Sequence, residues 1–251
     1  MSEKIKLFVK YQPTSAETVA EVSEWMTGAD ALIIDPCHCD VDKFQQLPVD
    51  NAVIYSGDPE RDLSWVENNL SQWVRDDGLV QLARLRDRWK ELNWVPRLNV
   101  YRQQTRYEFS GPALGEGFSF YMPDTSTIKG WHVTDEDMLL TEALTRATEL
   151  GFSTLWLHSP EAETRARGLD LDVLDKTRGS SLNIWLSGGA SEQKHLHNLT
   201  KAGGVSAVVV NEKLAQENTV KSLCRALEPD DTSREVAPVQ YVQCPSQAGK
   251  V

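Results

Sequence analysis

The stretch Ser187-Gly188-Gly189 has the residue types of a phosphate-binding turn. It lies between an apolar run and an amphipathic segment that predicts a helix. Adjacent glycines let the backbone approach an anion, and the N–H groups at the start of the next helix attract it. The next apolar run ends at Asn211, which is placed as a helix N-cap. We therefore expect Ser187, Gly188, Gly189 and Asn211 to hold a phosphate group, with a plain tight turn as the alternative.

The stretch DPCHCD, residues 35–40, combines two thiols, an imidazole and two carboxylates after another apolar run. Cysteine and histidine are zinc ligands, and a low-pKa thiol is reactive. Neighbouring residues of an extended chain point to opposite sides, however, and no second cluster completes a set of four ligands. Asp35, Cys37 and His38 are therefore additional candidate site residues, with an ordinary polar loop as the alternative. We expect no metal and no cofactor.

Several stretches repeat a pattern in which an amphipathic helix is followed by glycine and then by a β-branched or leucine-rich run. Gly28 and Gly151 stand just past two such helices, where a left-handed C-cap suits glycine. This alternation predicts parallel strands joined by crossover helices. Seven runs, with GLVQLA near residue 80 as a weak eighth, predict an α/β fold of the (β/α)8 TIM barrel type; an open doubly wound sheet is the alternative.

The predicted organisation is a single barrel domain, residues 1–227, followed by a C-terminal tail, residues 228–251. The tail has little periodicity and many chain breakers, so we expect it to be flexible. A polar, aromatic-rich segment around residues 101–131 predicts a long loop or hairpin after the fifth strand.

The composition excludes several classes of partner. The 251 residues are 40% hydrophobic and 25% charged, with a formal net charge of −11 that repels nucleic acid. No apolar run is long enough to span a bilayer, and the N-terminal residues lack the pattern of a signal peptide. Four cysteines are too few for a disulfide framework in a chain of this size. We expect a cytoplasmic protein that contacts neither nucleic acid nor membrane.

The stretches GW, ELGFSTLWLHS, RGLDLDVL, LNIWLSGGASEQKHLHNL and GGVSAVVVNEKL follow one another between residues 130 and 215. In order and spacing they resemble the phosphoribosyl-substrate barrels of histidine biosynthesis, namely the cyclase subunit of imidazole glycerol phosphate synthase and ProFAR isomerase. The resemblance implies a divergent member of this family, with the phosphate bound by the loops after the seventh and eighth strands.

The same resemblance suggests catalytic positions. The cyclase's second acid/base carboxylate corresponds to Glu142, nine residues before Gly151, and the isomerase's second Asp corresponds to His158 or Ser159. The family's first-strand Asp is missing, because Lys10 stands near that place. Proton transfer by Glu142, assisted by Lys10 or His158, is the chemistry that the resemblance implies.

Residues 6–36 also resemble the furan-phosphate synthase barrels, which use aldolase-type chemistry. In those enzymes a lysine follows the Asp of the second strand, where this chain has Cys37. Lys10 is a candidate Schiff-base nucleophile, with an anion-binding or a capping role as alternatives.

Three functions are consistent with these observations. The first is a diverged isomerase, cyclase or lyase of the histidine-biosynthesis type that acts on a phosphorylated metabolite. The second is a non-catalytic barrel that senses a phosphate ligand or forms a subunit of a larger complex, as a homo-oligomer or with a partner protein. The third is a Schiff-base aldolase-like relative of the furan-phosphate synthases.

Overall fold

The computed structural model describes residues 4–12, 19–34, 52–55, 70–102 and 130–228. The strands are β1 (Lys6–Tyr11), β2 (Ala31–Ile34), β3 (Ala52–Tyr55), β4 (Leu70–Arg75), β5 (Trp94–Arg102), β6 (Trp131–Val133), β7 (Met138–Leu139), β8 (Thr154–His158), β9 (Asn183–Ser187) and β10 (Ala207–Asn211). The α-helices are α1 (Val19–Met26), α4 (Leu79–Arg88), α5 (Leu140–Glu149), α6 (Pro160–Arg165), α7 (Leu174–Thr177), α8 (Lys194–Ala202), α9 (Glu212–Asn218) and α10 (Val220–Ala226). Two 3-10 turns, η3 (Thr134–Glu136) and η4 (Leu171–Val173), complete the described elements.

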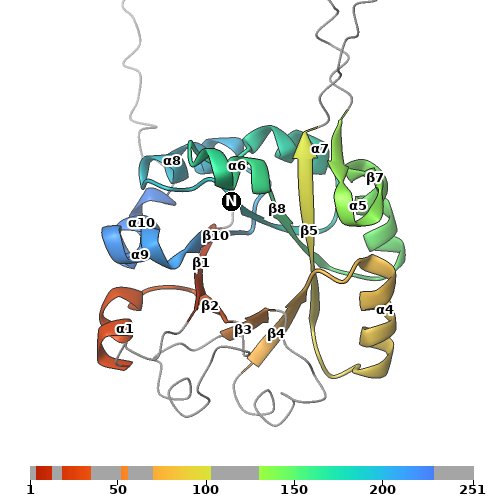
Figure 1. Ribbon diagram of the computed structural model, residues 1–251, viewed down its shortest axis with the longest axis horizontal. Coiled ribbons are helices and arrows are strands. Elements are labelled where there is room, and N and C mark those ends of the chain that lie inside the picture. Colours follow the sequence, from red (N-terminus) through yellow and green to blue (C-terminus); the bar gives the residue numbers. More distant parts are fainter. Residues whose placement is uncertain (1–3, 13–18, 35–51, 56–69, 103–129, 229–251) are drawn as a thin grey trace, which may run out of the picture.

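The ten strands form one mixed sheet in the order β4-β3-β2-β1-β10-β9-β8-β5-β6-β7, and β4 also pairs with β5. Neighbouring strands from β4 through β1 and β10 to β5 are parallel, whereas β6 and β7 are antiparallel. Figure 1 shows the helices around the outside of the curved sheet, with the parallel strands inside. The carboxyl ends of the parallel strands therefore meet at one edge.

The prediction of a (β/α)8 TIM barrel made up of eight parallel strands alone is wrong: the strands β1–β5 and β8–β10 are parallel and join into a ring through the β4–β5 pair, but the same sheet also contains antiparallel strands. After β5 the chain adds the antiparallel strands β6 and β7 before α5 begins. Asn99 is the last residue of β5 that pairs with β8, so residues 100–102 extend beyond that neighbour. Their backbone N–H and C=O groups pair with β6 instead, because buried polar backbone groups need partners. The result is a mixed sheet.

The segment GLVQLA, predicted as a weak eighth strand, is the start of α4. Leu79, Leu82 and Ala83 are buried, and this three-and-four spacing is helical. The strand lies earlier, in β4, where Trp73 and Val74 are fully buried. Polar residues around Trp73 interrupt the apolar run, which is why the sequence pattern does not indicate this strand.

Buried side chains form two clusters, one on each face of the sheet. The larger joins strand residues such as Leu7 and Leu157 to apolar residues of the helices, such as Leu144 of α5 and Leu196 of α8. The smaller is made up of strand residues: Phe8, Ala31, Ile33, Val74, Val95, Trp156, Trp185, Ala207 and Val209. Both faces of the parallel strands are thus apolar, as their continuous apolar runs require.

The helix α10 ends at Ala226, and residues 229–251, which hold nearly all of the predicted tail, lie outside the described residues. In the described ranges, no helix is both long and apolar enough to cross a membrane.

Candidate functional site

A hollow of about 170 Å³ lies at the carboxyl edge of β5, β8, β9, β10 and β1. These strands are neighbours in the sheet, so residues far apart in the sequence meet there. The hollow is lined by Lys10, Arg97, Trp156, His158, Glu163, Ser187, Gly188, Val209, Val210 and Asn211.

The two-residue period of a strand explains why polar groups gather at this edge. Phe8 and Trp185 belong to the smaller apolar cluster, where their rings meet edge to face with centroids 4.7 Å apart. Two residues further along each strand, Lys10 and Ser187 lie on the same face near the strand end. The alternation within β8 places His158 on this face too. The polar side chains at the strand ends therefore lie next to the apolar side chains of the smaller cluster.

The buried Ser187 hydroxyl is held by two neighbours. Trp156 Nε1–H donates to Ser187 Oγ at 2.7 Å, and His158 Nδ1 lies 2.9 Å from the same oxygen. Both contacts are satisfied if the serine O–H donates to Nδ1, which leaves the imidazole proton on Nε2. Ser187, expected to bind phosphate, thus orients His158.

His158 is held in its neutral form. Burial lowers the pKa of its imidazole to about 3, with further lowering by the positive charges of Arg97 and Lys10. The charge of Arg97 is partly balanced by Asp76, whose Oδ2 lies 3.4 Å from Arg97 Nη1, and the guanidinium lies 5.1 Å from the Trp156 ring centre. Two cations and a neutral imidazole therefore share one small hollow.

Close packing requires both glycines of the Gly188-Gly189 turn. Their φ angles are 104° and 89°, a left-handed region that disfavours other residues. A Cβ atom on Gly188 would collide with the carbonyl oxygen of Ser159, and one on Gly189 with that of Gly168. Close packing of a tight turn, the alternative to phosphate binding, is therefore a sufficient reason for glycine at both positions.

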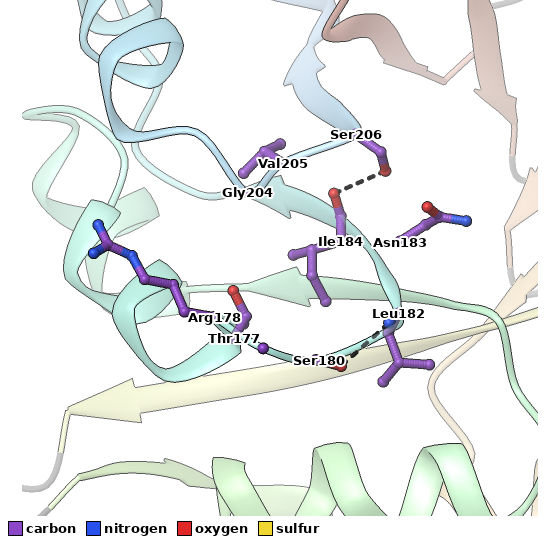
Figure 2. Close-up of a pocket in the computed structure, with 10 residues that line it drawn as sticks. Thr177, Arg178, Ser180, Leu182, Asn183, Ile184, Gly204, Val205 and Ser206 are labelled. Carbon is purple, nitrogen blue, oxygen red and sulfur yellow. Dashed lines mark hydrogen bonds between the residues drawn. The ribbon is translucent and has the colours of Figure 1, made fainter. Parts of the chain in front are cut away.

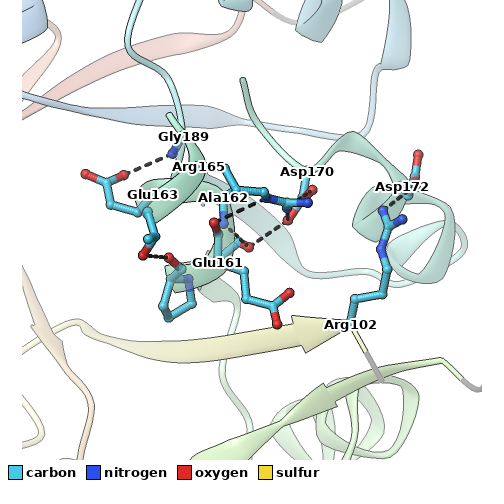
Figure 3. Close-up of polar contacts among 11 residues, drawn as sticks. Arg102, Glu161, Ala162, Glu163, Arg165, Asp170, Asp172 and Gly189 are labelled. Atoms are coloured by element: carbon cyan, nitrogen blue, oxygen red, sulfur yellow. Dashed lines mark hydrogen bonds and ion pairs between the residues drawn. The ribbon is translucent and has the colours of Figure 1, made fainter. Parts of the chain in front are cut away.

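One of the backbone donors expected to bind phosphate already has an anionic partner. The Gly189 N–H donates to Glu163 Oε2 at 2.9 Å (Figure 3). Glu163 lies on α6, within the segment that follows β8. An anion therefore does occupy this turn, and it is a side chain of the same protein.

The start of α6 is anchored by a polar network. Ser159 Oγ caps the helix by accepting from the Ala162 N–H at 3.2 Å, and it donates to Asp170 Oδ2 at 2.7 Å. Arg165 Nη2 lies 2.9 Å from both oxygens of Asp170 (Figure 3). These contacts tie both ends of α6 to one carboxylate and so position Glu163.

Asn211 is the N-cap of α9, as predicted, and its Oδ1 accepts from the Leu214 N–H at 2.9 Å. It faces Lys10 across the β1–β10 pair. Because β9 and β10 are paired, the turns that follow them lie side by side. The Asn211 side-chain oxygen is thus used within its own helix, and the residue is part of the lining of the hollow.

Glu142 lies apart from the other predicted catalytic residues. It stands in the first turn of α5, and its Oε2 accepts from the Leu139 N–H at 3.2 Å. It lines a different surface hollow, between Met138 and Glu149, whereas Lys10 and His158 come together at the strand edge. The structure gives Glu142 a helix-capping contact.

The remaining predicted site residues, Asp35, Cys37 and His38, lie outside the described residues. Within the described ranges, no three His, Cys, Asp or Glu side chains are placed to hold a metal ion.

Arg97 and Glu163 are site residues that were not among the predicted ones. Arg97 lies in the apolar strand β5, two residues after Val95, and so on the same face as the smaller apolar cluster. A charged residue on this face is the sequence feature that could have indicated a site residue. The contact of Glu163 with Gly189 spans 26 residues, so no local pattern indicates it. Only the tertiary fold joins them.

A larger hollow, about 440 Å³, lies at the opposite edge near the starts of β9 and β10 (Figure 2). Its lining includes Ser206, whose hydroxyl donates to the Ile184 carbonyl at 3.0 Å, and Arg178, which pairs with Asp175 at 3.1 Å. These two polar side chains have structural partners, and the smaller hollow brings together the more reactive set of groups.

The chain is similar in structure to a crystal structure described as the Amycolatopsis orientalis BexX/CysO complex. The TM-score is 0.55 and the identity 16%, over 90% of this chain and 88% of the other. At such low identity the similarity shows the fold alone. No protein-family model matches the sequence, and no curated protein matches it.

The predicted membership in the histidine-biosynthesis barrels is therefore wrong. It rested on the order and spacing of glycine-ended helices and apolar strands, which many parallel α/β sheets share. The similar structure carries a different description, and no protein-family model supports the membership.

Proposed function

We propose that this chain binds a small oxyanionic metabolite, a phosphate monoester or a carboxylate, in the hollow between Lys10, Arg97 and His158. The observation that carries the proposal is the meeting of two cationic side chains at one strand edge in a protein of net charge −11. Ligands of parallel α/β folds bind at the carboxyl ends of the strands. Local positive charge there attracts an anion that the rest of the surface repels.

The activity we propose is proton transfer on the bound metabolite, as in an isomerase or a lyase. With Nδ1 engaged by Ser187, the neutral His158 presents Nε2–H as a donor to a substrate oxygen that becomes negative. Lys10 is the neighbouring group able to hold or move a proton. Glu142 has no part in this chemistry, because it lines a different hollow.

The second candidate function is a non-catalytic, anion-sensing subunit that works with a partner protein. The description of the BexX/CysO structure as a complex favours it, since that structure has the same fold. The two candidates share the anion site and differ in whether the bound ligand reacts.

Calorimetric titration with inorganic phosphate and with acetate, at constant ionic strength, tests the anion site. We expect Lys10→Gln to weaken binding about tenfold, the usual effect of losing one charge-assisted hydrogen bond. The matched control is Lys6→Gln, at the other end of β1, which removes the same charge and should leave binding unchanged. Equal affinities in the two variants, or no binding by the parent chain at millimolar concentrations, would refute the proposal.

Hydrogen exchange separates the two candidates. A phosphorylated keto sugar such as ribulose 5-phosphate is incubated with the chain in D₂O, and deuterium uptake is followed by NMR. Uptake that His158→Asn abolishes supports the enzyme. Binding with no uptake supports the sensing subunit.

A further inference from the structure

We infer that Glu163 is a built-in competitor for the oxyanion site: its carboxylate holds the Gly189 N–H in the ligand-free chain and is displaced when a ligand oxyanion binds. The inference rests on the proposed function, because it concerns the same hollow. It adds a residue that sets the affinity of the site and its response to ligand concentration.

The Gly189 N–H is a donor of fixed direction. The Gly189 carbonyl accepts from the Gly168 N–H at 2.8 Å, and the backbone of residues 162 and 168 packs where a Cβ on Gly189 would lie. The turn therefore cannot rotate to find another acceptor. A ligand oxyanion that uses this N–H must take the place of the Glu163 oxygen, which lies 2.9 Å away.

The Glu163 carboxylate lies where it also opposes an anion electrostatically. Glu163 lines the same hollow as Lys10 and Arg97, so it offsets part of the positive charge that would attract the ligand. A ligand oxyanion beside an undisplaced Glu163 would experience like-charge repulsion. Movement of this carboxylate relieves that repulsion and releases a backbone donor at the same time.

Glu163 can leave without disrupting the fold. It is an exposed residue, whereas the turn it contacts is buried. The position of α6 depends on Ser159, Arg165 and Asp170, none of which uses the Glu163 carboxylate. Rotation of one exposed side chain into water therefore opens the donor while its helix stays in place.

The test compares Glu163→Gln and Glu163→Ala with the parent chain in titrations with inorganic phosphate. Alanine frees the N–H, whereas glutamine keeps an acceptor but loses the charge. The contact of the exposed Glu163 carboxylate with the Gly189 N–H has a modest energy. We therefore expect Glu163→Ala to tighten phosphate binding by about two- to fivefold, and Glu163→Gln to have an affinity between those of Glu163→Ala and the parent chain. Acetate, titrated in parallel, shows whether a carboxylate displaces Glu163 as phosphate does.

The control is Glu161→Gln, which removes the same charge from the same helix; Figure 3 draws Glu161 pointing away from Gly189. Its affinity for phosphate should equal the parent's. Weaker binding in Glu163→Gln would mean that Glu163 holds the ligand, and unchanged binding would mean that its contact is structural; either result overturns the inference. If instead Lys10→Gln and Lys6→Gln bind phosphate equally, the proposed function itself fails.

Discussion

The neutral state of His158 makes the stability of this protein depend on pH in a definite direction. The folded pKa is about 3, below the ordinary value of 6.5 that the unfolded chain has. Between these two values the unfolded state binds more protons than the folded state, so the free energy of unfolding falls as the pH falls through this window. Above the unfolded pKa the contribution of His158 is constant.

The size of the effect follows from the two pKa values. One pKa unit corresponds to about 1.4 kcal/mol, so lowering the pH from about 7 to about 5 costs about 2 kcal/mol at this one residue. The variant His158→Asn keeps a small polar side chain beside the Ser187 hydroxyl but cannot be protonated in this range. Over the same interval it should lose about 2 kcal/mol less stability than the parent chain.

Urea unfolding followed by circular dichroism, repeated across the pH range, measures this difference. Other titrating groups contribute equally to both chains, so they cancel in the comparison. The control is His197→Asn, which removes an exposed histidine from α8 and should follow the parent curve. Parallel curves for the parent and His158→Asn would show that His158 is not a buried neutral base, and the assigned hydrogen-bond pattern would then be wrong.

Three further predictions concern the turn and the helix caps. Gly188→Ala and Gly189→Ala should each lower the unfolding free energy by about 2 to 4 kcal/mol, because the new Cβ atom would collide with backbone atoms. The control Gly179→Ala has a φ of 85° but open space around it, so it should lower the unfolding free energy by about 1 kcal/mol. Equal losses for all three variants in urea titrations would argue against close packing at the turn. Asn211→Asp should keep the α9 cap and its stability but weaken phosphate binding beside Lys10, so unchanged calorimetric affinity would count against the site. Glu142→Ala should cost about 0.5 to 1 kcal/mol through its lost contact with the Leu139 N–H and leave phosphate affinity unchanged; weakened affinity would restore Glu142 to the site.

Local patterns in the sequence were sufficient for the elements whose apolar spacing is strong. The amphipathic pattern that precedes Gly151 predicts α5, and Leu140, Leu144 and Ala147 of this helix are buried. Gly151 ends that helix with a φ of 79°, and Asn211 caps α9. Helix spacing and capping act over a few residues, so the sequence carries them directly.

Local sequence patterns do not predict which strands pair when these are far apart in the chain. Residues 100–102 of β5 pair with β6 because they extend past β8, and no spacing within β5 records that neighbour. Trp73 is buried in β4 although Ser71 and Gln72 precede it, and its ring centre lies 5.9 Å from that of Trp94 in the neighbouring strand. The β5–β6 pairing makes the sheet mixed, whereas the sequence pattern predicts parallel strands alone.

The candidate site, too, has residues that local sequence patterns indicate and residues that only the tertiary structure places there. The sequence by itself determined that Lys10, His158 and Ser187 stand near the ends of apolar strands, because a two-residue period and a strand end are local properties. Only the tertiary structure decided that Arg97 joins them and that Glu163 occupies the glycine turn. Electrostatic and hydrogen-bond contacts depend on distance in space, and the chain brings these groups together from separate strands and a helix.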